Sequence, residues 1–348
     1  MSGDRRDGTE RDWLALQMTA ALRPREATAL LRGGASPRGA IDALNEAWPS
    51  EKRLREAERA LARLSGRLMP FGAPGFPGGL LGLDDAPPVL ALRGDAAALD
   101  APAVAIVGSR AASAYGLAVA RRVAGELARA GVSVVSGLAF GVDVAAHRGA
   151  LEAGGRTVAV QACGLDHVYP AAHRELADRI AASGAVVTEF AIGTAPRKGF
   201  FPLRNRLISG LSLAVVVVEA RERSGSLVTA RHAAEQGVDV FAVPGPIDRP
   251  HHVGTNRLLR DGAAPLLETR DLFDALAWPS TRRSASPEAP DSGATAEILE
   301  LLRRDSCDGD AVARRLGRAP EDVASALLEL ELAGRISRDR DGRWRVVS

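Results

Sequence analysis

The chain has 348 residues, of which 46% are hydrophobic, 25% charged and 4% aromatic, with a formal net charge of +2. This composition is typical of a globular protein, and the length allows one large domain with one or two small ones. The longest apolar runs, such as residues 213–218, are far shorter than the roughly 20 residues that span a bilayer, so we predict no membrane helix. Because the N-terminal residues lack the apolar core of a secretory signal and only two cysteines occur, we expect a reducing cytoplasm.

The charge is distributed unevenly along the chain. Residues 101–270 carry 19 Arg and Lys against 14 Asp and Glu, whereas residues 1–100 carry 14 of each and residues 294–348 carry 10 against 11. Because binding of a polyanion depends on local rather than net charge, the middle segment is the candidate for a nucleic-acid surface. The alternative is that the excess of five positive charges in this segment arises by chance and has no functional meaning.

Residues 1–70 are predicted to form a small helical domain, of a SAM-like or helix-hairpin-helix type. Apolar residues recur at helical spacing from Trp13 to Ala20, and the segment PREATALLRGG begins with proline and ends with glycines. The frequent Gly and Pro of residues 66–100 indicate an irregular connection into the next domain.

Residues 71–277 are predicted to form an extended Rossmann-like core. Short β-branched runs, each followed by a turn and an amphipathic helix, place strands at 104–107, 132–136, 157–162, 185–190, 213–218 and 238–243. Apolar strands that alternate with helices are typical of an α/β fold with a doubly wound, mostly parallel sheet. In such sheets, ligands bind at the carboxyl ends of the strands.

The C-terminal part is predicted to contain a flexible linker at 278–293 and a winged-helix domain at 294–348. The linker is rich in Pro, Ser and Ala without periodicity. After it come three helical segments, from about Ala294, at 309–316 and from near Pro320, and then a hairpin with a turn at Asp341-Gly342.

Two of the predicted strands end in glycine-rich segments. Gly108, Ser109 and Arg110 follow the first strand without the spacing of a GxGxxG motif, which disfavours a dinucleotide cofactor. Arg110 at this edge suits a phosphate, the alternative being a surface ion pair. Gly137, in SGLAFGVDVAAH, would let a ligand approach the backbone, although tight packing explains it equally well.

Two pairs of side chains could in principle hold a metal or act in catalysis. Asp143 and His147 are four residues apart on one helical face, and Cys163 lies close in sequence to His167. Neither pair belongs to a CxxC or HExxH spacing, and Cys163 follows a buried strand. We therefore expect packing roles, with no metal, no cofactor and no catalytic residue.

The segments FPLRNRLISG and SGSLVTA, at 201–210 and 224–230, predict two helix starts that bind anions. The first helix is expected to begin just after Pro202, with Arg204, Asn205 and Arg206 at its start. Phe201 and the nearby Lys198 add an aromatic face and a cation, a combination that suits single-stranded DNA. The alternative buries the phenylalanines and pairs the arginines on the surface. Ser224, Gly225 and Ser226 could donate to phosphate or simply cap the second helix.

These motifs resemble the DNA-processing protein A family, DprA or Smf: VGSR, SGLAFGVD, CGLDHVYP, FPLRNRLISGLS, SGSLVTA, and PGPI with GTNRLLRDGA occur in the family's order over about 100–270. The resemblance implies a non-enzymatic protein that binds and protects incoming single-stranded DNA, loads the RecA recombinase during natural transformation and recombination, and forms a homodimer through its core. Carried onto this chain, the implied DNA site comprises Gly108, Ser109, Arg110, Gly137, Lys198, Phe201, Arg204, Asn205, Arg206, Ser224, Gly225 and Ser226. One departure is Gln161-Ala162, where the family commonly has glycine, which leaves the backbone geometry there open.

Two other functions are weighed against DNA binding by the core. An enzyme of the nucleotide phosphoribohydrolase type is the main alternative, but its PGGxGTxxE signature requires a glutamate three residues after Thr229, and the next one here is Glu235. The winged helix could instead bind duplex DNA as a regulator. Its 10 basic against 11 acidic residues favour a role in protein contacts or as an accessory domain.

Overall fold

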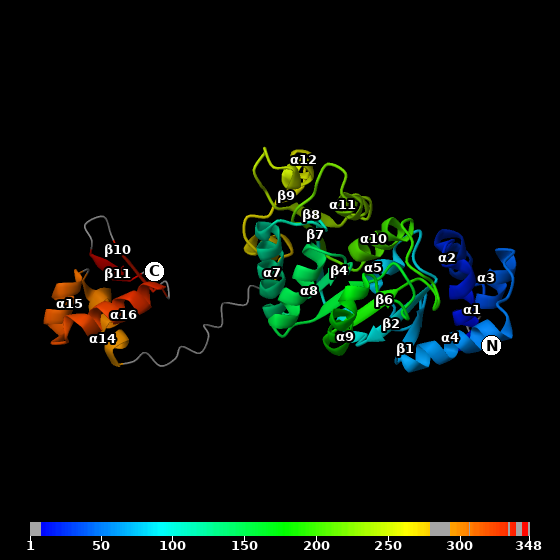
Figure 1. The fold of residues 1–348 in the computed structure, drawn as a ribbon, viewed down its shortest axis with the longest axis horizontal. Coiled ribbons are helices and arrows are strands. Elements are labelled where there is room, and N and C mark those ends of the chain that lie inside the picture. Colours follow the sequence, from blue (N-terminus) through cyan, green and yellow to red (C-terminus); the bar gives the residue numbers. More distant parts are fainter. Residues whose placement is uncertain (1–7, 279–292, 306, 333–334, 339–342, 347–348) are drawn as a thin grey trace. The chain divides into compact units, whose positions relative to one another are not determined.

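The computed structural model describes residues 8–278, 293–305, 307–332, 335–338 and 343–346 (Figure 1). The chain divides into two compact units, Met1–Pro279 and Ser280–Ser348. Residues 279–292, which make up most of the predicted linker, and the predicted turn at Asp341-Gly342 lie outside the described residues. The domain boundaries given above remain predictions.

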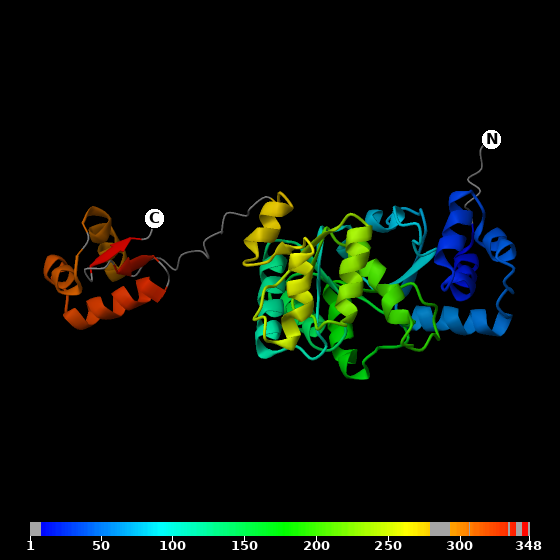
Figure 2. The ribbon, with the colours of Figure 1, turned by 90° about the horizontal axis from the view of Figure 1, so that it is seen from above.

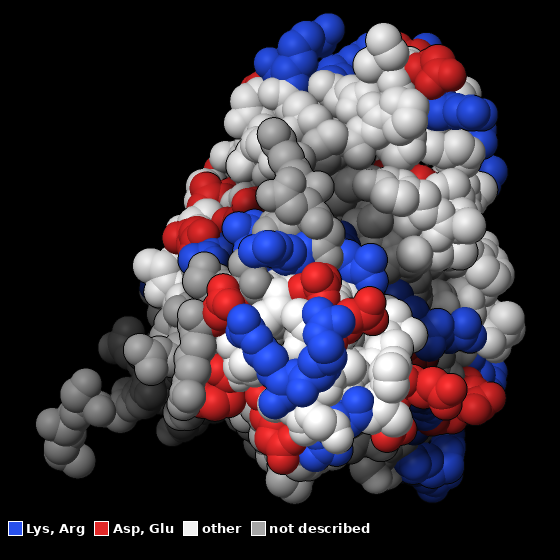
Figure 3. All heavy atoms as spheres, turned by 90° about the vertical axis from the view of Figure 1, so that its left-hand side faces the viewer, with Lys and Arg blue, Asp and Glu red and all other residues white. Residues whose placement is uncertain are grey.

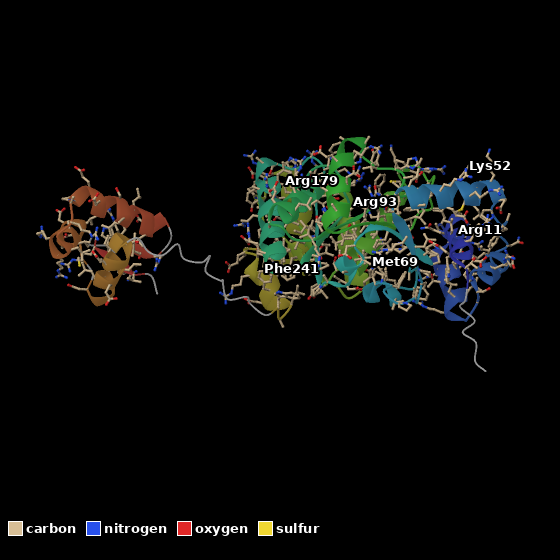
Figure 4. The ribbon with its side chains drawn as sticks, turned by 90° about the horizontal axis from the view of Figure 1, so that it is seen from below. Arg11, Lys52, Met69, Arg93, Arg179 and Phe241 are labelled. Carbon is tan, nitrogen blue, oxygen red and sulfur yellow. The ribbon has the colours of Figure 1, made fainter. Side chains whose placement is uncertain are left out.

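The first unit begins with a cluster of four helices. They are α1 (Glu10–Ala20), α2 (Pro24–Arg32), α3 (Pro37–Ala43) and α4 (Glu51–Arg63). Thr9, Ser36 and Ser50 cap α1, α3 and α4 by accepting hydrogen bonds from backbone N–H groups of the first turn. Figure 4 labels Arg11 on α1 and Lys52 on α4, both within this helical end of the unit.

A nine-stranded sheet forms the centre of the first unit. Its order is β1-β2-β6-β5-β4-β3-β7-β8-β9. The six predicted strands are confirmed as β3 (Ala103–Val107), β4 (Ser133–Ser136), β5 (Thr157–Val160), β6 (Ala185–Thr188), β7 (Ala214–Val217) and β8 (Asp239–Ala242), and the short β9 (Ala264–Pro265) follows them. All of these strands are parallel to their neighbours within this part of the sheet.

The expectation of an irregular connection at residues 66–100 is wrong. Two strands, β1 (Gly66–Pro70) and β2 (Val89–Gly94), pair with each other, and β2 pairs with β6, both in the antiparallel sense. Figure 4 labels Met69 on β1 and Arg93 on β2. Gly and Pro around these short strands obscure the pattern in the sequence, and the partner strand β6 lies about 90 residues further along the chain.

Helices cover both faces of the sheet, as near-continuous apolar strands require. Val104 and Ile106 of β3 face the core formed with α7 (Ala114–Arg129) and α8 (Val142–Glu152). Ala105 and Val107, one residue out of phase, face the core with α10 (Phe200–Gly210) and α11 (Gly225–Glu235). The remaining helices are α5 (Gly78–Leu81), α6 (Ala97–Asp100), α9 (Arg174–Ser183), α12 (Val253–Arg260) and α13 (Arg270–Ala275), with single 3₁₀ turns at Ala171–His173 and Pro250–His252.

The second unit has three helices followed by a two-stranded sheet, drawn in orange and red in Figure 2. These elements are α14 (Gly293–Arg304), α15 (Gly309–Leu316), α16 (Pro320–Leu332), β10 (Ile336–Arg338) and β11 (Trp344–Val346). Ile298, Val312, Leu327 and Trp344 form its core. This is the predicted winged-helix arrangement, so the fold class is confirmed for both units. None of the helices in the described residues is long and apolar enough to cross a membrane.

Candidate functional site

The sheet contains one point at which its winding direction reverses. From β3 the chain proceeds outward through β4, β5 and β6, and then returns to β7 on the other side of β3. Ligands of doubly wound sheets bind in the crevice at the carboxyl ends of the strands at such a point. A cavity of about 450 Å³ is found there, lined by the segments that follow β3, β4 and β7 and by the starts of α10 and α11.

Nine of the twelve predicted site residues line this pocket. They are Gly108, Ser109, Arg110, Phe201, Arg204, Asn205, Ser224, Gly225 and Ser226. The other three, Gly137, Lys198 and Arg206, do not line it. Four arginines but one carboxylate, Asp143, are among the lining residues.

The segment after β3 forms one wall of the pocket. A Cβ atom on Gly108 would lie 2.6 Å from the side chain of Val142, so only glycine lets this loop pack against α8. The backbone N–H of Val142 donates to the carbonyl of Ser109 at 3.2 Å and fixes the loop to the start of α8. Arg110 is exposed and its guanidinium lies 5.0 Å from the ring centre of Phe201. It has no carboxylate partner among the residues that the structure describes, which leaves its charge available to a ligand.

Helix α10 begins at Phe200, two residues before Pro202, so the predicted start just after Pro202 is wrong. Proline is compatible with the first turn, where its missing N–H has no partner within the helix. The two phenylalanines have different environments: Phe200 is buried and stacks on Phe190, whereas Phe201 is half-buried and lines the pocket. The alternative that buries both phenylalanines therefore holds for Phe200 alone.

Arg204 forms part of the pocket wall but is only 3% exposed. Its Nη1 donates to the carbonyl of Gly137 at 2.8 Å and also to the carbonyl of Val160. Burial, with a contribution from Arg110, lowers the pKa of Arg204 to about 10, which still leaves it charged at neutral pH. Its Nη1 thus joins the ends of β4 and β5, and its charge acts on the pocket from within the wall.

Arg206 lies on the side of α10 that does not line the pocket. Its Nη1 and Nη2 donate to the two carboxylate oxygens of Glu189 at 2.9 and 2.6 Å, and its Nε lies 3.0 Å from Asp85. Burial opposes its charge, but Glu189 and Asp85 together raise the pKa of Arg206. This geometry does not favour the predicted phosphate contact by Arg206, because the protein itself supplies two carboxylates to this 3% exposed side chain.

Helix α11 directs its N-terminus into the pocket, as the serine and glycine pattern predicts. Ser224 is its N-cap: the side-chain oxygen accepts from the N–H of Ser226 at 3.4 Å and lies 2.8 Å from the Ser226 hydroxyl. The serines therefore cap the helix and also line the cavity. The unpaired N–H groups and positive dipole end of an 11-residue helix favour an anion at this position.

Arg221 and Arg223 also line the pocket, although they are not among the predicted site residues. Both are exposed, and neither has a carboxylate partner within the described part of the chain. Their position in the segment after β7, the strand next to β3, is the signal that would have identified them. With Arg110 they give the pocket three cations that have no ion pair with a carboxylate of the described residues.

Gly137 and Lys198 are not among the residues that line the pocket. Gly137 is behind it: its carbonyl accepts from Arg204, and its N–H donates to Asp143 at 3.1 Å. A Cβ atom there would lie 2.6 Å from the Arg204 guanidinium, so glycine is required for that contact. Lys198 is exposed, just before the start of α10.

The residues considered for metal binding or catalysis are held by other contacts. Burial raises the pKa of Cys163 to about 11, and its Sγ lies 3.7 Å from the backbone carbonyl of His167. Asp143 accepts from the N–H groups of Gly137 and Ala139, whereas His147 Nδ1 pairs with Thr157 at 2.7 Å. Their predicted packing roles agree with this geometry. In the described residues no group of three or more His, Cys, Asp and Glu side chains could hold a metal ion.

Comparison with known proteins identifies relatives of both units. Residues 67–277 match the family of DNA recombination-mediator protein A, and residues 282–342 match the DprA winged helix domain. Protein Smf of Escherichia coli is 41% identical over 279 residues, which cover 78% of this chain and 75% of that protein. DNA processing protein DprA of Bacillus subtilis is 41% identical over 209 residues, 60% of this chain and 70% of that protein.

Two solved structures share the fold. DNA processing protein A from Streptococcus pneumoniae superposes with a TM-score of 0.66 at 31% identity and covers 77% of this chain and 98% of its own. DNA processing protein A from Helicobacter pylori, whose structure describes a single-stranded DNA binding mode, gives 0.55 at 32% identity over 60% and 95% of the two chains. From the family match over 67–277, the curated relatives and these structures, the chain belongs to the DNA recombination-mediator protein A family, known as DprA or Smf.

Proposed function

We propose that this chain binds single-stranded DNA in the pocket at the carboxyl ends of β3 and β7. The observation that carries the proposal is the set of three exposed arginines without carboxylate partners, Arg110, Arg221 and Arg223, around the N-terminus of α11 and the ring of Phe201. Cations and a helix N-terminus suit phosphates, and an accessible aromatic ring suits an unpaired base. The Helicobacter pylori relative, described by its single-stranded DNA binding mode, supports the same ligand class.

The proposal also includes the biological setting that family membership suggests: protection of incoming DNA and loading of the RecA recombinase during natural transformation and recombination. A homodimer formed through the core belongs to the same proposal. Family membership supports this setting.

A binding function without catalysis fits the pocket better than nucleotide hydrolysis. Asp143 is the one carboxylate among the lining residues, and two backbone N–H groups already donate to it. Burial raises the pKa of Asp143, although Arg204 opposes this rise. A hydrolase needs an acid or base that reaches the substrate, and this buried carboxylate has its contacts within the wall.

The test is binding of labelled oligonucleotides by the whole protein over a range of salt concentrations, with single strands and duplexes of the same sequence. We expect preference for the single strand and a steep loss of affinity with salt. Arg110→Ala and Arg223→Ala should each weaken binding by about five- to tenfold and reduce the salt slope by about 0.7. Arg59→Ala, which removes an exposed arginine on α4, is the matched control.

Equal affinity for duplex and single strand would contradict the proposed function. Release of free base from a nucleoside monophosphate by the purified protein would instead support the hydrolase.

A further inference from the structure

Two exposed aromatic residues beside the pocket have no role in the function proposed above. Phe140 is 50% exposed and Tyr169 is 46% exposed. The chain has only eight Phe, two Tyr and four Trp, so exposed rings are scarce. Single exposed apolar residues are normal on protein surfaces, but a group of them next to a ligand pocket indicates an interaction site.

Contacts between rings connect both residues to the pocket. The ring centre of Tyr169 lies 5.5 Å from that of Phe201, which lines the cavity. Phe140 follows Ala139, another lining residue, and its ring contacts His173 edge to face at 4.7 Å. His173 belongs to the 3₁₀ turn just after Tyr169, so the two exposed rings flank one short segment.

The backbone that carries Phe140 is held in a fixed conformation. Leu138 has a positive φ of 58°, and its carbonyl is 2.8 Å from Nδ1 of the buried His173. Asp143 accepts from the N–H of Ala139 at 3.2 Å. Positive φ is costly for leucine and persists where surrounding contacts enforce it. The exposed ring of Phe140 is therefore presented on a rigid support.

The charges around these rings are mixed. Arg110 lies over Phe201, and Arg174 is exposed next to His173, whereas Asp166 and Glu175 lie in the same region of the chain. Asp166 is already engaged by the N–H of Gly193 at 2.9 Å and by His167. A surface of exposed rings with balanced charge suits the faces of bases better than a row of phosphates.

We propose that Phe140 and Tyr169 form a second base-binding platform that extends the pocket, so that a bound strand passes from Phe201 to Tyr169 and Phe140. This inference rests on the proposed function, because it takes the ligand of the pocket to be single-stranded DNA. It adds that the site holds more bases than the cavity alone and that strand length determines affinity.

The experiment compares binding of oligo(dT) strands of 3, 6, 12 and 20 nucleotides to the full-length protein and to Phe140→Leu and Tyr169→Leu. We expect each substitution to weaken binding of the 20-mer at least fivefold, as the loss of one stacked base predicts, and that of the 3-mer less than twofold. Tyr169→Phe should keep the wild-type affinity, since stacking needs the ring and not the hydroxyl. Tyr115→Leu, which removes the other exposed tyrosine at 51% exposure, is the matched control.

Crosslinking of the wild-type protein gives a readout that does not depend on the stability of a variant. Strands of 20 nucleotides with single 5-iodouracil substitutions should crosslink to Tyr169 or Phe140 at positions outside those that crosslink to Phe201. If the wild-type protein binds single strands, two results would overturn the platform while leaving the proposed function intact. One is that Phe140→Leu and Tyr169→Leu lose affinity equally for strands of every length, and the other is that neither ring crosslinks to the DNA. Failure of the wild-type protein to bind any single strand would refute the proposed function itself.

Discussion

The buried pair of Arg206 and Glu189 gives a direct test of which arginines stabilise the fold and which bind the ligand. Their side chains are 3% and 2% exposed and are joined by two parallel hydrogen bonds. Arg206→Met would leave the Glu189 carboxylate buried without a partner. Removal of one member of a buried ion pair costs about 3–5 kcal/mol, and we expect a loss of this size in the free energy of unfolding.

The assay is urea unfolding followed by circular dichroism at neutral pH, with single-strand binding measured where every variant is folded. The double substitution Arg206→Met with Glu189→Met removes the uncompensated charge and should recover at least half of the lost stability. Affinity of Arg206→Met for single-stranded DNA should stay within twofold of wild type. Arg110→Met is the contrasting variant, expected to keep stability and lose affinity, because its side chain is exposed and faces the pocket.

A result in which Arg206→Met unfolds like wild type but binds single-stranded DNA tenfold more weakly would refute this reasoning. It would mean that Arg206 leaves Glu189 and reaches a phosphate in the complex.

Three further predictions concern residues behind or beside the pocket. Burial lowers the pKa of His147 to about 3, with a smaller contribution from Arg204; because the unfolded value is about 6.5, stability should fall as pH drops below 6.5, by about 1.4 kcal/mol at pH 5.5. Urea unfolding at pH 7.5 and 5.5 should show a smaller pH effect on stability for His147→Asn than for the wild-type protein, and an equal effect in the two proteins would contradict the assignment. Gly137→Ala should displace the Arg204 guanidinium and lower both the stability of the protein and its affinity for single-stranded DNA. If this variant unfolds thermally and binds single-stranded DNA like the wild-type protein, the prediction is wrong and Arg204 adapts to the added methyl group without cost. Ser224→Ala should destabilise the start of α11 by about 1 kcal/mol and weaken binding, measured by urea unfolding and oligonucleotide titration, with Ser224→Asn expected to preserve the cap.

Residues 294–348, in the second unit, carry 10 basic and 11 acidic side chains. Acidic and basic side chains are interspersed over the face shown in Figure 3. Helix α16 has Glu321 and Asp322 in its first turn and no basic residue in its last turn. A role of the winged helix in protein contacts or as an accessory domain stays a prediction.

Much of the core could be predicted because its signals are local. Each of the six parallel strands is a short run rich in Val and Ala followed by a turn and an amphipathic helix, and each strand lies within one to two residues of its predicted start. Strands β1 and β2 could not be predicted in the same way, because they are stabilised by antiparallel pairing with each other and with the distant β6. The Ser224 cap was recognisable for the same reason as the parallel strands, since its partner is two residues away.

The sequence by itself determined the doubly wound fold, the edge of the sheet that carries the pocket, and nine of the residues that line it. Only the tertiary structure decided which arginines have free charges. Arg204 and Arg206 are two residues apart in a basic segment, yet one joins the ends of β4 and β5 and the other is neutralised by Glu189 and Asp85. The two carboxylates that pair with Arg206 lie 17 and 121 residues before it in the sequence, and local sequence patterns carry no information about contacts at such separations.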